Sequence, residues 1–222
     1  MTARLTQIDQ EEVLRYLGCT SAPDPQLLDQ ISRLGAELMA ASVPRLVWRR
    51  LPLTKEHKYL LSGKDIRNLL RDCTELVLFA ATLGAEVEGF LRRAQIRDMS
   101  QAVILDACAD SAIENVCDHF CEDLAALVHP CFLTDRFSPG YGDMPLSHQS
   151  VLFDVLDVTR RIGVTLTDSG LMLPQKSVTA MIGISDKPQL RRINGCMGCS
   201  MNLNCIYRKE RRNCEKHGIY HS

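Results

Sequence analysis

The chain has 222 residues, of which 26 are basic, 27 are acidic and 45% are hydrophobic, as in an ordinary globular protein with a sizeable core. Because the charges nearly cancel, the composition argues against a nucleic-acid-binding protein, which usually has a basic surplus. The sequence has no apolar run of the roughly 18 residues that cross a bilayer, and its start has no secretory signal. We therefore expect a cytoplasmic protein with no membrane and no nucleic-acid partner.

The first part of the sequence predicts helices interrupted by two strands. Helix starts are expected at Asp9 and Asp24, because their side chains can accept hydrogen bonds from the N–H groups of a first turn. The helix after Asp24 has an apolar stripe at helical spacing, formed by Leu27, Leu28, Ile31, Leu34 and Leu38. Residues 45–53 predict a strand, residues 64–72 a short helix, and the apolar run 76–82 a buried strand.

The second part predicts a long helix and then short strands. Residues 98–128 have an apolar side chain every three or four positions and no glycine or proline, which is typical of one long helix. Residues 147–157 predict a short helix. Alternating apolar and polar residues predict three strands, at 164–167, 171–173 and 177–185. The expected fold class is α+β for a domain of residues 1–190, followed by a cysteine-rich tail, 191–222.

The turn-rich segment RFSPGYGDMPLS, residues 136–147, contains an arginine and a tyrosine that a plain linker would not need. Arg136 offers a planar fork that matches a carboxylate or a phosphate. Pro139 stiffens the chain, and Gly140 lets a backbone N–H approach a ligand closely. Tyr141 adds a flat face with a hydroxyl at its rim. These residues suit an amino-acid-like or nucleotide-like ligand, although the same segment is also a good turn, and that alternative stays open.

The cysteines are distributed unevenly. Cys108, Cys117 and Cys121 lie in the predicted long helix, where a free cysteine behaves as a small apolar filler. Four others crowd the tail: Cys196, Cys199, Cys205 and Cys214. In a reducing compartment such a group is more typical of a metal site than of disulfides. Thiolates favour an iron–sulfur cluster or zinc, and uncoordinated thiols are the third alternative.

No catalytic side chain is predicted. The six histidines are dispersed, and the sequence has neither an HExxH motif nor a Ser/His/Asp order. Lys176, just before the last predicted strand, is expected to be a solvated turn lysine, with contact to a ligand as the alternative. The basic run 208–212 is a solvated face or a docking site for an acidic partner.

Two segments in order, RFSPGYGDMPLSHQ and LTDSGLMLPQKSVTAMIGIS, resemble the activation domain of cobalamin-dependent methionine synthase. That family has an Arg-x-x-x-Gly-Tyr loop, followed by a Ser/Met/Pro-rich hairpin that leads into an apolar strand. The likeness extends upstream through LFAATLGAEVEGFL and ILDACADSAIENVCDHF, so that it covers most of residues 75–190. The resemblance implies a curved antiparallel sheet flanked by helices, with a shallow site for S-adenosylmethionine.

The resemblance also implies roles for single residues. Arg136 would hold the carboxylate of the ligand, while Pro139, Gly140 and Tyr141 would line the site. Glu114, on the long helix, would lie near the charged methionyl end of the ligand. A solvated carboxylate is the alternative for Glu114, and Asp110 lies one helical turn away on the same face.

The function implied by this resemblance is reactivation of cobalamin by one-electron reduction and methyl transfer from S-adenosylmethionine, in which the protein positions the donor. The sequence contains no Asp-x-His-x-x-Gly signature of a cobalamin-binding module. We therefore expect an accessory, freestanding unit that acts in trans on a methionine synthase without its own activation domain, or on another corrinoid-binding protein. The tail of freestanding relatives is similar and suggests an iron–sulfur electron carrier, with flavodoxin or ferredoxin as a candidate donor. The alternatives are a non-enzymatic partner of a corrinoid protein and a zinc-stabilised scaffold.

Overall fold

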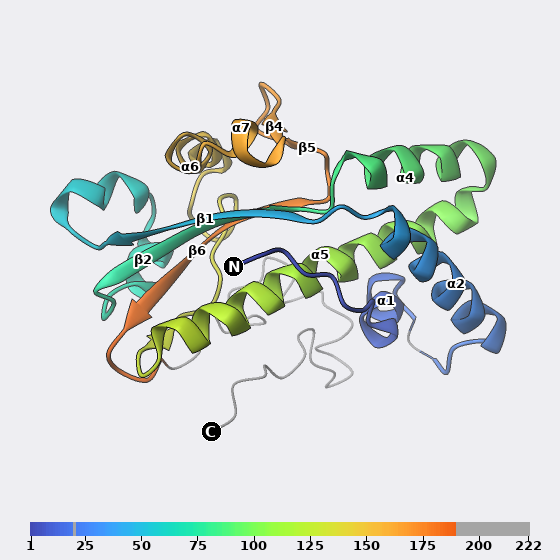
Figure 1. Ribbon diagram of the computed structural model, residues 1–222, viewed down its shortest axis with the longest axis horizontal. Coiled ribbons are helices and arrows are strands. Elements are labelled where there is room, and N and C mark those ends of the chain that lie inside the picture. Colours follow the sequence, from blue (N-terminus) through green and yellow to red (C-terminus); the bar gives the residue numbers. More distant parts are fainter. Residues whose placement is uncertain (20, 190–222) are drawn as a thin grey trace.

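The computed structural model describes residues 1–19 and 21–189. Its centre is an antiparallel sheet of four strands in the order β1-β2-β6-β3, and Figure 1 shows helices on both sides of this sheet. The strands are β1 (Arg45–Pro52), β2 (Glu75–Thr82), β6 (Ser177–Ser185) and β3 (Phe132–Leu133). A separate hairpin joins β4 (Thr165–Leu166) to β5 (Met172–Leu173). The predicted α+β fold class and the antiparallel sheet are confirmed.

The helices vary from one and a half turns to about eight. They are α1 (Gln10–Tyr16), α2 (Pro25–Ala41), α3 (Lys64–Leu69), α4 (Ala85–Arg97), α5 (Met99–Val128), α6 (Gln149–Leu156) and α7 (Val158–Ile162), with the 3-10 turns η1 (Lys55–Leu60) and η2 (Leu146–His148). Asp9 and Asp24 accept hydrogen bonds from the first turns of α1 and α2, as predicted, and Asp98 does the same for α5. Among the described residues, no helix has both the length and the hydrophobicity that a transmembrane span requires.

The sheet separates two apolar cores, because successive side chains of a strand point to opposite faces. On β2, Val77 and Phe79 belong to the core that contains α1, α2, α4 and α5, whereas Leu76 and Leu78 belong to the core of α3, α6 and α7. Phe79 packs against Phe120 of α5, with ring centroids 4.7 Å apart. The buried position predicted for this strand is therefore confirmed, and it applies to both faces.

Two of the cysteines of α5 are part of the first core, as predicted. Cys108 and Cys117 are fully buried, while Cys121 is partly exposed. Burial raises the pKa of Cys108 to about 12 and that of Cys121 to about 11. Because the thiolate is the reactive form, these thiols serve packing rather than chemistry.

Several elements are missing from the sequence-based prediction, and their composition explains why. The helix α4 buries only Val87 and Leu91 among its 13 residues, so its apolar stripe is too thin to be recognised. The strand β3 has two residues and the helix α7 has five, which is too short for a periodic pattern. The strands predicted at 164–167 and 171–173 are two-residue strands of the β4–β5 hairpin.

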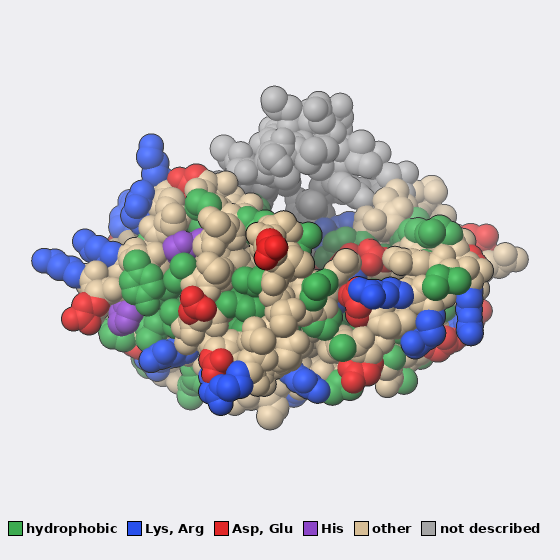
Figure 2. All heavy atoms as spheres, turned by 90° about the horizontal axis from the view of Figure 1, so that it is seen from above, with side chains coloured by type: hydrophobic (Ala, Val, Ile, Leu, Met, Phe, Trp, Pro, Cys, Tyr) green, Lys and Arg blue, Asp and Glu red, His purple; other side chains and the backbone are tan. Residues whose placement is uncertain are grey.

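The near-neutral net charge conceals an uneven distribution of charge among the elements. The helix α5 has six acidic residues and no lysine or arginine. The turn η1 and the helix α3 together carry four exposed basic residues, Lys55, Lys58, Lys64 and Arg67. Figure 2 shows lysine and arginine side chains that project at the left end, which is the end of η1 and α3 in Figure 1. The acidic residues of α5 and these basic residues therefore belong to different elements.

Candidate functional site

A β-bulge between β3 and the turn-rich loop places Arg136. Thr134 lies opposite Gly183 of β6, and its N–H donates to the Gly183 carbonyl at 3.0 Å. Three residues later, Phe137 pairs with Met181, which is only two residues away from Gly183. One extra residue on this side of the pairing is a β-bulge, which redirects a side chain. Phe137 is buried in the core of α3, α6 and α7, whereas Arg136 reaches α5 on the other side of the sheet.

The guanidinium of Arg136 lies between two carboxylates of α5. Its Nη2 is 2.7 Å from Glu114 Oε2 and 3.1 Å from Asp118 Oδ1. One guanidinium bridges both, because residues four apart are neighbours on a helix face. Burial lowers the pKa of Arg136, but neighbouring negative charges, among them Glu114 and Asp118, oppose this effect and the pKa is raised overall, so the side chain stays charged. The structure thus brings together two of the predicted ligand-binding residues, Arg136 and Glu114.

These carboxylates belong to a longer acidic row on α5. The row repeats every four residues and consists of Asp106, Asp110, Glu114, Asp118 and Glu122. Lys176 binds the start of the row, with its Nζ 2.9 Å from Asp106 Oδ1 and 2.7 Å from Asp110 Oδ1. Its side chain is only 11% exposed, so the expectation of a solvated turn lysine was wrong. Lys176 lies in the short connection from β5 to β6, which places its side chain against α5. The residues next to Lys176 in the sequence do not indicate this contact.

The acidic row keeps an excess of negative charge around Arg136. Burial raises the pKa of Asp110 and of Asp118 above their ordinary value, although Lys176 and Arg136 oppose the shift. Glu114 adds to both shifts, since a neighbouring negative charge disfavours ionisation. One guanidinium between two carboxylates leaves a surface that favours a cationic group.

The N-terminal segment runs along the adjacent side of α5. The N–H of Thr6 donates to Asn115 Oδ1 at 3.0 Å, and the N–H of Asp9 donates to Ser111 Oγ at 3.0 Å. Positions 111 and 115 form the row of α5 next to positions 110 and 114. The acidic row therefore lies between the N-terminal segment and the loop that carries Arg136.

Two residues of α1 also influence this part of α5, and the sequence did not point to either of them. Burial raises the pKa of Glu12, and burial followed by the charges of Glu12 and Glu114 raises the pKa of Tyr16. Both residues of α1 are thus within electrostatic range of Glu114. No local signal could have found them, because the contact joins segments about a hundred residues apart.

The loop after Arg136 closes on itself. The Tyr141 N–H donates to the Ser138 carbonyl at 3.1 Å. With Pro139 second and Gly140 third, at a φ of +87°, these four residues form a type II turn. The Gly140 N–H donates to the Met144 carbonyl at 3.0 Å. The N–H that we expected to approach a ligand is therefore engaged within the loop.

The side chains of this turn differ in exposure. Pro139 is buried, whereas Tyr141 is 40% exposed. Tyr141 packs edge-on against Phe137, with ring centroids 5.6 Å apart and an interplanar angle of 90°. This contact with a core residue fixes the Tyr141 ring at the point where the loop leaves the bulge. Ligand binding by Pro139, Gly140 and Tyr141 remains a prediction.

The predicted metal ligands cannot be placed in the same way. Cys196, Cys199, Cys205 and Cys214 lie outside the described residues. Within residues 1–19 and 21–189, no group of three or more His, Cys, Asp and Glu side chains is arranged to hold a metal ion. A metal site on the tail therefore stays a prediction.

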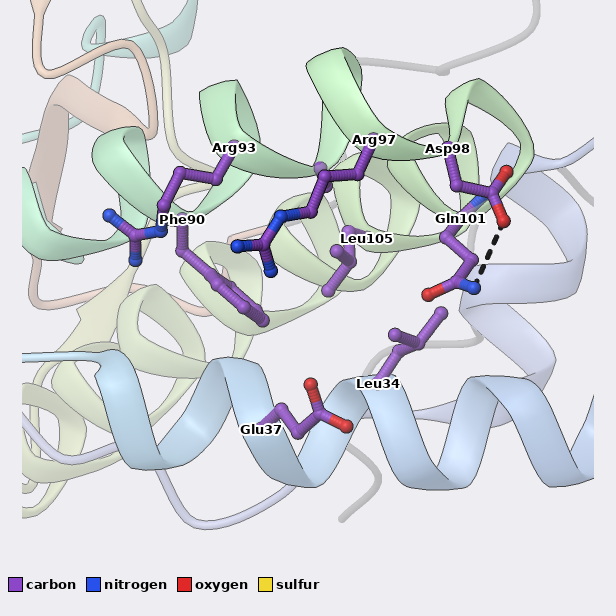
Figure 3. A pocket seen from close by; sticks show the side chains of 9 residues that line it. Leu34, Glu37, Phe90, Arg93, Arg97, Asp98, Gln101 and Leu105 are labelled. Carbon is purple, nitrogen blue, oxygen red and sulfur yellow. Dashed lines mark hydrogen bonds between the residues drawn. The ribbon is translucent and has the colours of Figure 1, made fainter.

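A cavity of about 130 Å³ lies away from the loop, between α2, α4 and α5. Figure 3 shows Phe90 and Leu105 in the space between α4 and α2, with Arg97 on the α4 side and Glu37 on the α2 side. None of the predicted ligand-binding residues lines this cavity. The site expected at Arg136 and this cavity are therefore separate.

Comparisons with known proteins agree with the fold and with the family that the sequence resembles. The family model described as "Vitamin B12 dependent methionine synthase, activation domain" matches residues 70–194, which is more than half of the chain. Among solved structures, the chain is similar to the "Crystal Structure of the MetH Reactivation Domain bound to AdoHcy", with 15% identity and a TM-score of 0.52 over 96% of this chain and 88% of that chain. At this identity the likeness shows the fold alone. No curated protein sequence matches the chain. The match to the family model shows that the chain belongs to the family of vitamin B12-dependent methionine synthase activation domains.

Proposed function

We propose that this chain is a reactivation unit that binds S-adenosylmethionine and supports reductive methylation of cobalamin held by a partner protein. The partner is a methionine synthase without its own activation domain or a related corrinoid-binding methyltransferase. The observation that carries the proposal is the Arg136–Glu114 ion pair beside the 138–144 loop, in a chain of the activation domain family. We place the reaction in the cytoplasm, where free thiols stay reduced.

The charges around Arg136 suit this ligand. S-adenosylmethionine carries a carboxylate, an ammonium and a sulfonium, so its net charge is positive. Arginine has five N–H donors, and both ion pairs that Arg136 forms among the described residues use Nη2. We assign Nη1, which neither of these two ion pairs uses, to the ligand carboxylate, and Glu114 and Asp118 to the positive groups of the ligand. The excess of negative charge on this part of α5 attracts a cationic donor.

The loop contributes shape, one carbonyl oxygen and a ring. The N–H groups of Gly140 and Tyr141 donate within the loop, and the Tyr141 carbonyl accepts the Met144 N–H at 3.1 Å, so we assign the Gly140 carbonyl oxygen and the Tyr141 ring to the ligand. The methyl group of a sulfonium is already electrophilic, so the chain needs no nucleophile and acts by positioning. The reduced cobalt of the partner's cobalamin supplies the electron pair for the new bond, and the donor leaves as a thioether.

The proposal is tested by titrating the protein with S-adenosylmethionine in a calorimeter. We expect saturable binding, and then formation of methylcobalamin, followed by its absorption spectrum, when a corrinoid partner and a reductant are added. Omitting either the chain or S-adenosylmethionine is the control. The absence of heat at millimolar ligand would contradict the proposal.

One observation favours a second function, that of a non-enzymatic partner of a corrinoid protein with a vestigial ligand site. The Nη2 of Arg136 is already held by Glu114 and Asp118, as it would be in a site that no longer binds a ligand. Co-purification with the corrinoid protein, without measurable binding of S-adenosylmethionine, would support this second function.

We further propose that the tail cysteines hold an iron–sulfur cluster that receives an electron from a flavodoxin or a ferredoxin. Anaerobically purified protein is expected to contain iron and to absorb broadly in the visible range. Both properties should be lost in the Cys196→Ser/Cys199→Ser variant, because soft thiolates are the ligands of such clusters. They should persist in Cys19→Ser, which removes a thiol at the end of α1.

The metal content of the same preparation separates the alternatives. A colourless protein that contains zinc, lost in the Cys196→Ser/Cys199→Ser variant, would indicate a zinc-stabilised scaffold. A protein without metal would contradict both forms of the tail proposal.

A further inference from the structure

The turn-rich loop is fastened to the start of α3, 79 residues earlier in the sequence. Asp143 Oδ2 accepts the Lys64 N–H at 2.6 Å, and Asp143 Oδ1 accepts the Asp65 N–H at 3.1 Å. In return, Asp65 Oδ2 accepts the Asp143 N–H at 3.2 Å. We call these three reciprocal hydrogen bonds the Asp65–Asp143 clip. Each aspartate binds the backbone of the segment that carries the other.

Two glycines make room for the clip. A Cβ on Gly63 would collide with the Asp143 carboxylate, and a Cβ on Gly142 would collide with the Asp65 carboxylate. Both segments therefore have glycine at the point where the opposing carboxylate approaches the backbone. The backbone N–H donors also lower the pKa of Asp143, so its carboxylate is ionised at neutral pH.

The clip is one of several anchors that fix the loop. Met144, the residue after Asp143, is 2% exposed and lies in the core that contains Leu60. His148 Nε2 lies 3.0 Å from the Leu60 carbonyl oxygen. At the other end, Phe137 is paired to β6. The turn 138–142 is therefore held at both ends, by Phe137 at its start and by Asp143 and Met144 at its end. The clip is part of the anchor at its end.

We propose that Asp65 and Asp143 are positioning residues, which hold the 138–142 turn in its ligand-binding shape before the ligand arrives. This assignment rests on the proposed function. Fixing a flexible segment costs conformational entropy, and a loop that is ordered beforehand does not subtract that cost from binding. Both aspartates act through the backbone of the loop, because their carboxylates are engaged by N–H groups.

The assignment predicts graded losses of affinity. Asp143→Ala removes both accepted bonds and is expected to raise the Kd for S-adenosylmethionine about tenfold, the cost of ordering about one loop residue. Asp143→Asn keeps one carbonyl acceptor, so its Kd should lie between those of the wild type and Asp143→Ala. The matched control is Asp98→Ala, which removes an aspartate that accepts the N–H groups of Ser100 and Gln101 at the start of α5. The Kd of this control should stay within about twofold, although thermal denaturation should detect the loss of its helix cap.

Hydrogen exchange gives a readout that needs no ligand. In Asp143→Ala, the loop N–H groups of Gly140, Tyr141 and Met144 should exchange faster, while that of Met181 on β6 stays protected. Asp98→Ala should leave all four unchanged. If the loop N–H groups exchange at the same rate in Asp143→Ala as in the wild type, the clip does not order the loop. This conclusion holds whatever the Kd for S-adenosylmethionine is.

The two measurements together separate the two proposals. Faster loop exchange with an unchanged Kd overturns the positioning role of the clip and leaves the proposed function intact. A wild-type protein that binds no S-adenosylmethionine overturns the proposed function, and the positioning role falls with it, even where exchange confirms that the clip orders the loop.

Discussion

Arg136→Ala is expected to weaken the binding of S-adenosylmethionine by about a hundredfold or more. A hydrogen bond to a charged group contributes about 1.5–3 kcal/mol, and about 2.7 kcal/mol corresponds to a hundredfold change in Kd. Two such bonds from the guanidinium to the ligand carboxylate would therefore suffice. The substitution also leaves Glu114 and Asp118 without the cation that lies between them. Calorimetric titration measures the change.

Two further variants show whether the loss is specific. Arg136→Lys keeps the positive charge but not the planar fork, so about a tenfold weakening is expected. Arg50→Ala breaks an ion pair with Glu75 on the exposed surface of β1 and β2, away from the loop. Its Kd should equal that of the wild type. An unchanged Kd in Arg136→Ala would show that the guanidinium does not contact the ligand.

The sequence pointed to Arg136 and Glu114, which the structure brings together, but it did not predict their surroundings. The identity of Arg136 follows from the Arg-x-x-x-Gly-Tyr motif, and the place of Glu114 on the long helix follows from its position relative to that motif. Asp118 was missed, although a carboxylate one helical turn after Glu114 is a readable signal. Lys176 was judged from its neighbours alone, whereas its burial depends on two carboxylates of α5.

Features that depend on register between distant segments could not be predicted. Between Thr134 and Phe137 the chain advances by three residues, while the paired residues of β6 advance by only two, and this difference is the β-bulge. No local sequence pattern encodes it. The Asp65–Asp143 clip joins two aspartates that are each ordinary turn residues in sequence. The strands β1, β2 and β6 were readable because burial imposes a period, or an unbroken apolar run, on their side chains. The site thus combines residues of recognisable chemistry with a geometry set by long-range pairing.

Gly183→Ala is expected to lower the free energy of unfolding by about 2 kcal/mol, the usual range for overpacking being about 1–3 kcal/mol. Gly183 lies in the central strand β6, opposite Thr134 at the start of the bulge. A Cβ there would lie 2.5 Å from both Cys73 Sγ and Leu70 Cδ2, and 3.0 Å from Thr134 Cγ2. All three neighbours would have to move together. Chemical denaturation of both proteins gives the difference directly.

A double-mutant cycle with Cys73→Ala tests the proposed cause. Removing Sγ makes room for the new methyl group, so Gly183→Ala should cost less in the Cys73→Ala background than in the wild type. Gly89→Ala on α4 is the matched control, because a Cβ there would approach only the flexible Arg93 side chain, at 3.4 Å. That substitution should stabilise the protein slightly, as alanine is the better helix former.

The same variant connects the packing of the sheet to the ligand site. Because Thr134 begins the bulge that directs Arg136 toward α5, displacing Thr134 should shift the guanidinium relative to Glu114. We therefore expect Gly183→Ala to weaken the binding of S-adenosylmethionine as well as to destabilise the fold, and Cys73→Ala to restore part of both. Costs of Gly183→Ala that are equal in the two backgrounds would show that Cys73 is not the obstructing neighbour. If Gly183→Ala lowers the stability by the expected amount but leaves the Kd unchanged, the bulge holds Arg136 independently of the strand opposite to it.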